Sequence, residues 1–194
     1  MRWIVIDGID GSGKSTYARW VKEHYESLGE AVLVRIHPSE RFLGALTRKT
    51  LQGKGRMLRL VASIFFIGDV LSSLRRLRKD GKRYDTVIYV RYLMATAYLP
   101  GRFIQLGYDF FAKLLPVPER LLLVDIDPAV AMRRIERRNE AKEMFEDIES
   151  LRRIREKVLR LARNGWKVIE NNEDVDRMPP ALIKIIRDWD AKFP

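Results

Sequence analysis

Residues 2–16 read RWIVIDGIDGSGKST, an apolar run that passes directly into a glycine-rich turn. The apolar run predicts a buried strand, and the residues after the turn have the spacing of an amphipathic helix. The turn itself, from Gly8 to Ser15, satisfies the pattern G-x-x-x-x-G-K-[ST] in the strand–turn–helix context that the pattern requires. This stretch predicts an α/β fold built around a phosphate-binding loop.

The residue types in this loop suit the recognition of a triphosphate. Glycines let the backbone curl so that its N–H groups point inward, and the following helix directs its positive N-terminal end at the same place. Lys14 would reach the β- and γ-phosphates, and the hydroxyl of Ser15 would bind Mg²⁺. We therefore expect ATP and Mg²⁺ as cofactors. The candidate nucleotide-binding residues are Gly8, Ile9, Asp10, Gly11, Ser12, Gly13, Lys14, Ser15 and Thr16.

The rest of the chain alternates short apolar runs with longer segments of helical period. The apolar runs that predict strands occupy residues 2–7, 31–36, 86–90, 120–126 and 166–170. These runs are nearly continuous, which is typical of a parallel sheet covered by helices on both faces. The longest predicted helix covers residues 56–78. The pattern predicts a three-layer α/β fold with a five-stranded parallel sheet and ligands at the carboxyl ends of its strands.

Composition narrows the class of protein further. The chain has 194 residues, an apolar fraction of 46%, no cysteine and a formal net charge of +11. Its length favours a single domain over residues 1–194, and the lack of cysteine excludes disulfides, a thiol nucleophile and cysteine-ligated metals. The longest apolar stretch, residues 61–67, is far shorter than a membrane span of ~20 residues, and the N-terminus lacks the apolar core of a signal peptide. We expect a cytoplasmic protein that binds acidic ligands and no membrane.

Six blocks of sequence together resemble the thymidylate kinase family. They follow the family's order at roughly its spacing and extend over nearly the whole chain. The blocks are IVIDGIDGSGKST, VRIHPSERFLG, FFIGDV, VIYVRYLMATAYLPG, LVDIDPAVAMRRIERR and EMFED. The resemblance implies the P-loop NTPase fold, a mobile lid that carries arginines, and commonly a homodimer. It also implies Mg²⁺-dependent transfer of the γ-phosphoryl group of ATP to a nucleoside monophosphate, usually dTMP.

The resemblance also implies roles on the acceptor side. Asp10 would face the sugar of the acceptor, and Phe66 would stack on its base. Arg35 would contact the acceptor from the phosphate side, and Arg91 would hold the acceptor phosphate. Tyr92 matches the last residue of the family's Asp-Arg-Tyr/His motif. The candidate substrate-binding residues are Asp10, Arg35, Phe66, Arg91 and Tyr92.

Two positions depart from the family's pattern. The aspartate of the Asp-Arg-Tyr motif is Val90 in this chain, which removes a carboxylate expected near the metal. The arginine expected after Asp69 is Val70, which removes a positive charge from the acceptor site. Both changes lie on the side that selects or activates the acceptor, whereas the ATP side matches the family's pattern.

A run of arginines predicts where charge on the transferred phosphoryl group is neutralised. Arg134 and Arg138 lie four residues apart and match the arginines that open the family's lid, at approximately residues 134–147. The phosphate loop carries no arginine at its variable positions, so a lid arginine is the candidate for stabilising the transition state. Arg133 and Arg137 form a second pair that cannot face the phosphates together with the first, so one pair is expected to be structural or solvent-exposed. The candidate catalytic residues are Lys14, Arg91, Arg134 and Arg138.

Three functions are compatible with the sequence. The first is an ATP-dependent kinase of a nucleoside monophosphate, with dTMP as the leading acceptor. The second is a kinase of the same fold that acts on a different nucleotide, a nucleoside or a small metabolite, and the valines at 70 and 90 motivate it. The third is a nucleotide-dependent nucleic-acid-binding or regulatory module, motivated by the net charge of +11. No recognition motif supports the third, so a nucleic-acid partner is not expected.

Overall fold

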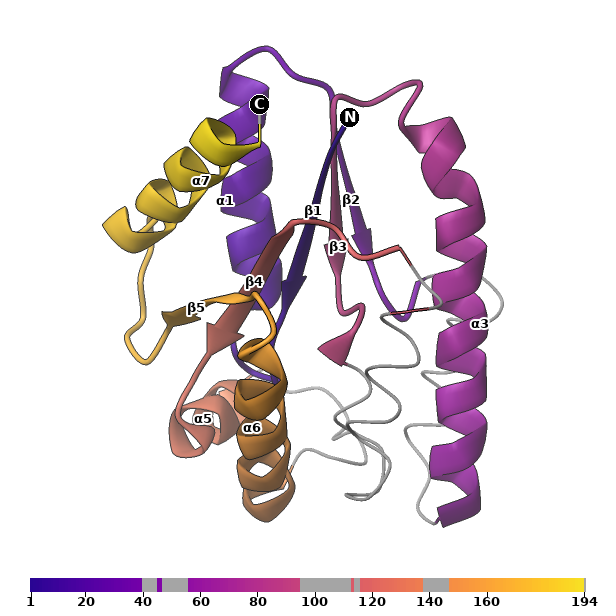
Figure 1. Cartoon of the computed structure of the whole chain (residues 1–194). Helices are drawn as coiled ribbons and strands as arrows, with labels where there is room; N and C mark the ends of the chain where they lie inside the picture. The colour runs from indigo at the N-terminus through magenta and orange to yellow at the C-terminus, as the bar shows by residue number, and fades with distance from the viewer. Residues whose placement is uncertain (40–44, 47–55, 95–112, 114–115, 138–146, 194) are drawn as a thin grey trace.

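One sheet of five parallel strands organises the protein, and its strand order is β2-β3-β1-β4-β5 (Figure 1). The computed structural model describes residues 1–39, 45–46, 56–94, 113, 116–137 and 147–193. The strands are β1 (Arg2–Asp7), β2 (Val32–Ile36), β3 (Thr86–Val90), β4 (Arg120–Asp125) and β5 (Lys167–Glu170). The sequence predicts all five to within one residue at each end, and the parallel α/β fold is confirmed.

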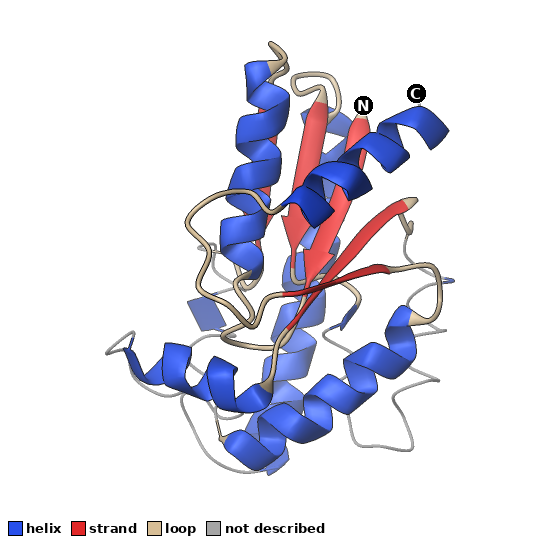
Figure 2. Cartoon of the chain, turned by 90° about the vertical axis from the view of Figure 1, so that its left-hand side faces the viewer, coloured by secondary structure: helices blue, strands red, loops and turns tan. Residues whose placement is uncertain are grey.

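Helices cover both faces of this sheet (Figure 2). The helices are α1 (Lys14–Ser27), α3 (Arg56–Asp80), α5 (Pro128–Arg137), α6 (Ile148–Ala162) and α7 (Pro180–Lys192). One hydrophobic core joins α1 and α7 to one face, and a second core joins α3, α5 and α6 to the other. Among the described residues, no helix combines the length and the apolar character that crossing a membrane requires.

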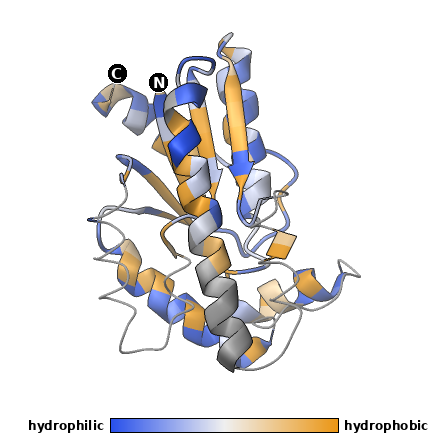
Figure 3. Ribbon diagram, turned by 90° about the vertical axis from the view of Figure 1, so that its right-hand side faces the viewer, coloured by the Kyte–Doolittle hydropathy of each residue, from blue (hydrophilic) through white to orange (hydrophobic). Residues whose placement is uncertain are grey.

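The alternation of side chains along the strands explains why both faces are apolar. On β1, Ile4 and Ile6 face α1 and α7, whereas Val5 faces the opposite set of helices, and all three side chains are fully buried. Figure 3 shows the strands as predominantly hydrophobic. Since each buried aliphatic side chain of this size contributes about 1.5–3 kcal/mol, the doubly covered sheet provides a stable platform for the loops at its edge.

The strand order places a ligand site at the carboxyl end of β1. The chain leaves β1 towards β2 on one side of the sheet and, after β3, reaches β4 on the other side of β1. Such a change of direction opens a crevice at the carboxyl ends of the strands, where α/β proteins bind ligands. The register pairs Ile6 with Val90 and Asp7 with Leu123, so the loop after β1 begins between the ends of β3 and β4.

Candidate active site

The phosphate loop curls between the carboxyl end of β1 and the first turn of α1. Gly11 and Gly13 have φ angles of 79° and 86°, in the left-handed region that favours glycine. A Cβ on Gly11 would lie 2.7 Å from the carbonyl oxygen of Ala131, and one on Gly13 would lie 2.5 Å from Nδ2 of Asn171. Both glycines are therefore required by their backbone conformation and by close packing. The loop leads into the N-terminal end of α1, the end of a helix that attracts anions.

Asp10 joins two cations at this loop. Its Oδ1 accepts a hydrogen bond from Nη2 of Arg91 at 2.5 Å and another from Nζ of Lys14 at 3.3 Å. Nζ of Lys14 also donates to the carbonyl oxygen of Ile9 at 2.9 Å. The side chains of Asp10 and Lys14 are buried, whereas that of Arg91 is 29% exposed. The structure thus brings together three of the residues for which the sequence predicts a role in the site.

This cluster shifts the pKa values of its members. Burial by itself raises the pKa of Asp10, but the charges of Lys14 and Arg91 outweigh burial and hold that pKa well below its usual range. Burial and the charge of Arg91 lower the pKa of Lys14 to about 8, against the opposing charges of Asp10 and Asp7. Asp10 is therefore a carboxylate at neutral pH, and Lys14 holds its proton less firmly than an ordinary lysine.

Asp7 fastens the phosphate loop to the segment that follows β3. Its Oδ1 accepts the N–H of Gly8 at 3.0 Å, and its Oδ2 accepts the N–H groups of Tyr92 and Met94 at 2.9 and 3.1 Å. Burial raises the pKa of Asp7, although the three hydrogen bonds oppose the rise. Because both oxygens bind backbone N–H groups, this side chain holds two loops together.

The backbone of Arg91 adopts an unusual conformation. Its φ of 60° is the only positive value at a non-glycine position within the described part of the chain. Such a backbone conformation costs about 1–3 kcal/mol of folding free energy, and it persists where the surrounding contacts enforce it. Here the N–H of Arg91 donates to the carbonyl oxygen of Ile6 at 3.2 Å, and the N–H of Tyr92 is held by the carboxylate of Asp7. We call the contacts of Asp7 with both loops the Asp7 bridge. The guanidinium is thereby turned to Asp10, with Nη1 at 3.5 Å from the carbonyl oxygen of His37.

The predicted metal ligand, Ser15, lies exposed in the first turn of α1. Mg²⁺ prefers oxygen ligands, keeps several waters and is bound in kinases largely through substrate phosphates. An exposed hydroxyl directly after the lysine of the phosphate loop fits that requirement. Within the described residues, no group of three or more His, Cys, Asp and Glu side chains forms a separate metal site.

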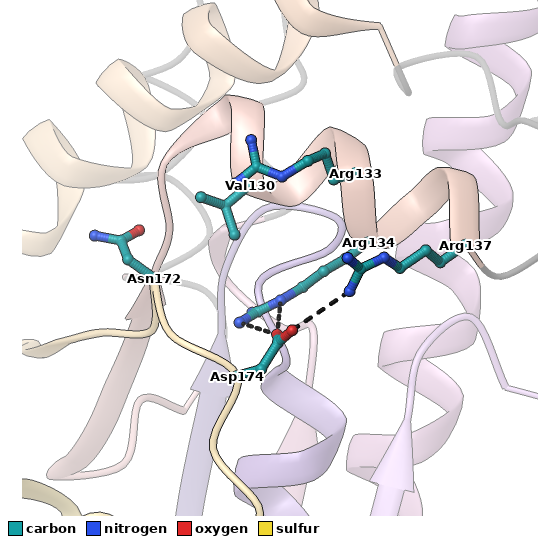
Figure 4. A pocket seen from close by; sticks show the side chains of 6 residues that line it. All are labelled: Val130, Arg133, Arg134, Arg137, Asn172 and Asp174. Atoms are coloured by element: carbon teal, nitrogen blue, oxygen red, sulfur yellow. Dashed lines mark hydrogen bonds and ion pairs between the residues drawn. The ribbon is translucent and has the colours of Figure 1, made fainter.

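Arg134 borders the phosphate loop from α5. Its Nε donates to Oδ1 of Asp174 at 3.1 Å (Figure 4). Its Nη2 donates to the carbonyl oxygen of Glu173 at 2.8 Å. Its Nη1 lies 4.0 Å from the point where a Cβ on Gly13 would stand. Arg138 lies outside the described residues, as does most of the predicted lid.

A small pocket opens beside Arg134, between α5 and the segment that follows β5. Its volume is about 120 Å³. The lining residues are Val130, Arg133, Arg134, Arg137, Asn172 and Asp174. Planar guanidinium groups along its wall suit the face of an aromatic ring. The pocket therefore presents guanidinium groups next to Arg134, which itself borders the phosphate loop.

Arg35 does not reach this loop in the structure. Its Nε and Nη2 both bind Oδ2 of Asp80, the last residue of α3, at 2.9 and 2.7 Å. The reason is the two-residue period of a strand, which puts Arg35 and His37 on the side of β2 that faces α3. The guanidinium is only 17% exposed in this ion pair. The structure places Arg35 in an ion pair between β2 and α3, and the acceptor contact that the resemblance implies stays a prediction.

Tyr92 and Phe66 are also placed by packing. Tyr92 is 3% exposed, and its hydroxyl donates to the carbonyl oxygen of Pro116 at 2.9 Å. Its backbone N–H, rather than its side chain, belongs to the site through Asp7. Phe66 is half-buried on α3, with its ring centroid 6.3 Å from that of His37. Phe66 therefore lies near His37, the residue directly after β2, whereas the ring of Tyr92 belongs to the core.

The two positions that depart from the family's pattern are both buried. Val70 is 3% exposed in the core under α3, and Val90 is fully buried in the core under α1. The ring of His37, directly after β2, is also buried, with Nε2 at 2.9 Å from Oγ of Ser73. Burial lowers the pKa of His37, which favours its neutral form. Both side chains of Val70 and Val90 therefore lie in the hydrophobic cores, at positions where the family pattern carries charge.

Sequence reasoning missed the contribution of the segment after β5. Nδ2 of Asn171 donates to the carbonyl oxygen of Ser12 at 2.8 Å, and the N–H of Asn171 donates to the carbonyl oxygen of Asp125 at 2.8 Å. Asp174, three residues later, binds Arg134. Its place in the sequence could have indicated Asn171, because this residue directly follows a predicted strand, and ligands bind at the carboxyl ends of such strands.

Comparisons with known proteins agree with this geometry. Residues 6–178 match a family model described as thymidylate kinase. The chain is 29% identical to the thymidylate kinase of Leptospira borgpetersenii serovar Hardjo-bovis, over 98% of this chain and 96% of that protein. It is 32% identical to the probable thymidylate kinase 1 of Saccharolobus solfataricus, over 95% of this chain and 96% of that protein. The fold also matches a crystal structure of thymidylate kinase from Ehrlichia chaffeensis with a TM-score of 0.66, over 98% of both chains at 19% identity.

Proposed function

The chain belongs to the thymidylate kinase family, and from this premise we propose that it transfers the γ-phosphoryl group of ATP to a nucleoside monophosphate, with dTMP as the acceptor. The observation that carries the proposal is the cluster at Asp10. One carboxylate oxygen binds both the lysine of the phosphate loop and the arginine assigned to the acceptor phosphate. Two phosphate-binding cations on one oxygen suit a reaction that brings two phosphate groups together.

Transfer depends on positioning and on neutralisation of charge. An oxygen of the acceptor phosphate forms a bond to the γ-phosphorus, and the bond from that phosphorus to the bridging oxygen of ADP breaks. ATP supplies the phosphoryl group, and the hydroxyl of Ser15 would help to hold Mg²⁺, which would offset the charge of the phosphates. Lys14 binds the β- and γ-phosphates, and Arg91 holds the acceptor phosphate in line. Asp10 keeps these two cations at a fixed spacing and offers an acceptor for a sugar hydroxyl.

Arginines from α5 and the lid complete the neutralisation of charge. Arg134 lies beside Gly13, and Arg138 is proposed to close on the phosphates from the lid. Arginines that stabilise phosphoryl transfer contribute on the order of 10³–10⁵ in rate. The pocket next to Arg134 is proposed to hold the base of ATP.

A screen of acceptors tests the proposal. Release of ADP is measured by a coupled assay with ATP, Mg²⁺ and each nucleoside monophosphate in turn. We expect turnover with dTMP above that with every other acceptor. Folded protein that binds ATP but turns over no acceptor would exclude the kinase assignment.

A different acceptor is the second candidate, and the buried valines at 70 and 90 favour it. Both positions lack charges that the family pattern places on the acceptor side. Under this alternative dTMP is a poor substrate in the same screen, and another nucleotide, a nucleoside or a small phosphorylated metabolite is clearly better. Higher turnover with dTMP than with any of these would reject the alternative.

Quaternary structure and location are further proposals from the family resemblance. We propose a single catalytic domain per chain, with a lid near residues 134–147, that works as a homodimer in the cytoplasm. Sedimentation velocity at micromolar concentration tests the dimer, and a single monomeric species would reject it.

A further inference from the structure

The segment after β5 holds Arg134 in one orientation. Oδ1 of Asp174 binds Nε at 3.1 Å and Nη2 at 2.9 Å, and the carbonyl oxygen of Glu173 binds Nη2 at 2.8 Å. As a result the side chain of Arg134 is only 18% exposed, although it projects from the last turn of α5. Arg137 shares the same carboxylate at 3.4 Å and remains 72% exposed, so Arg134 is held far more closely.

These contacts decide which edge of the guanidinium faces the phosphate loop. The Nε and Nη2 edge is turned to the segment after β5. Nη1 lies on the opposite side, 4.0 Å from the Cβ position of Gly13. The charge of Arg134 also acts on Tyr17 in the first turn of α1, where burial raises the pKa of the tyrosine and Arg134 opposes the rise. Figure 4 shows both arginines converging on Asp174.

We propose that Asp174 is a positioning residue for binding of the donor nucleotide. Asp174 holds Arg134 so that Nη1 of Arg134 points to the phosphates of ATP at Gly13. The proposal rests on the proposed function, since it needs ATP in the phosphate loop. A guanidinium offers two donating edges, and a carboxylate that takes one edge orients the other. Asp174 acts through Arg134 and makes no contact of its own with the nucleotide.

The sign of the effect separates positioning from simple electrostatics. A carboxylate near a triphosphate repels it, so electrostatics alone predicts that removing Asp174 strengthens ATP binding. Positioning predicts weaker binding, because Arg134 loses the contacts that hold it against the loop. The loss of one oriented, charge-assisted hydrogen bond corresponds to a roughly five- to tenfold rise in Kd.

The test is an equilibrium titration of the full chain with ATP and Mg²⁺ in the absence of acceptor. Isothermal titration calorimetry measures the Kd for ATP. The variants are Asp174→Ala, Asp174→Glu and Arg134→Ala, together with the double variant that combines Asp174→Ala and Arg134→Ala. Asp176→Ala is the matched control, because Asp176 is an exposed carboxylate on the same segment. The side chain of Asp174 is 71% exposed, so its replacement leaves the fold intact, which thermal melting verifies.

We expect Asp174→Ala to raise the Kd for ATP, Asp174→Glu to restore most of the affinity, and the control to bind like the unsubstituted protein. Asp174→Ala should add nothing once Arg134 is already alanine. In steady-state kinetics the effect should appear in KM for ATP more than in kcat. Equal or tighter ATP binding by Asp174→Ala, or a further loss in the Arg134→Ala background, overturns the inference. Failure of the unsubstituted protein to bind ATP would instead overturn the proposed function itself.

Discussion

The proposed donor half and the proposed acceptor half of the site are built in different ways. The donor half is one short stretch of chain, from Gly8 to Thr16, which α5 and the segment after β5 close from outside. The acceptor half joins Arg91 to Asp10 and to His37, residues that lie 81 and 54 positions away in sequence. The donor half keeps every residue of its motif, whereas the acceptor half buries valines at 70 and 90.

This contrast shows how a family member diverges. A triphosphate is recognised by backbone N–H groups and one lysine, so most substitutions in the loop disturb its conformation. The proposed acceptor contacts come from single side chains on separate elements, so a substitution at one of them leaves the backbone of the phosphate loop in place. Asp10 belongs to both halves, because it binds Lys14 and Arg91 on the same oxygen. Replacing either partner of Asp10, Lys14 in one half or Arg91 in the other, therefore tests how independent the two halves are.

The largest effect is expected from Lys14→Ala. Lys14 supplies the charge on the β- and γ-phosphates, and its loss should lower kcat/KM by on the order of 10³ or more. Turnover in the coupled assay measures the effect, and circular dichroism confirms folding. Lys14→Arg, which keeps the charge, is the control. An active Lys14→Ala variant would show that the donor half does not bind the transferred phosphate.

A large effect on stability is expected from Val90→Asp. Val90 is fully buried in the core under α1, and an unpaired carboxylate there should lower the free energy of unfolding by about 3–5 kcal/mol. Val90→Thr, of nearly the same shape, should cost much less. Urea denaturation of both variants measures the difference. A stable Val90→Asp protein with improved dTMP turnover would mean that the acceptor half retains room for the family's carboxylate.

Arg91→Ala should lower kcat/KM for the acceptor by roughly 10², because one charge-assisted contact to its phosphate is lost. The Kd for ATP should change little, which distinguishes the acceptor half from the donor half. Arg91→Lys is the charge-conserving control. An equal loss of affinity for ATP and for the acceptor would contradict the division between the two halves.

The smallest effect is a pH dependence of ATP binding. The pKa of Lys14 is lowered to about 8, so the side chain loses its proton as the pH rises through that value. A bound triphosphate favours the ammonium form, so binding above pH 8 takes up a proton and weakens by at most about tenfold per pH unit. Calorimetry at pH 8.5 in buffers of different ionisation enthalpy measures the uptake. Lys14→Arg should show none, and uptake in that variant would assign the proton to another group.

The sequence predicts those parts of the protein that depend on local rules. The strands follow from continuous apolar runs, and the phosphate loop follows from glycine spacing, since both are determined by neighbouring residues. The ion pair of Arg35 with Asp80 was not predicted, because matching a motif does not tell which face of β2 a side chain occupies. The roles of Asp7, Asn171 and Asp174 depend on contacts with distant segments, which a single sequence does not reveal.

The Asp7 bridge has a consequence for attempts to change the acceptor by grafting. One short carboxylate ties the start of the phosphate loop to the backbone N–H groups of Tyr92 and Met94. A chimaera that imports the segment after β3 from another kinase therefore keeps its alignment with ATP only if the imported backbone presents two N–H groups to Asp7. In such a graft the side chains at 92 and 94 can vary as far as packing in the core allows. The path of the main chain at these positions cannot vary.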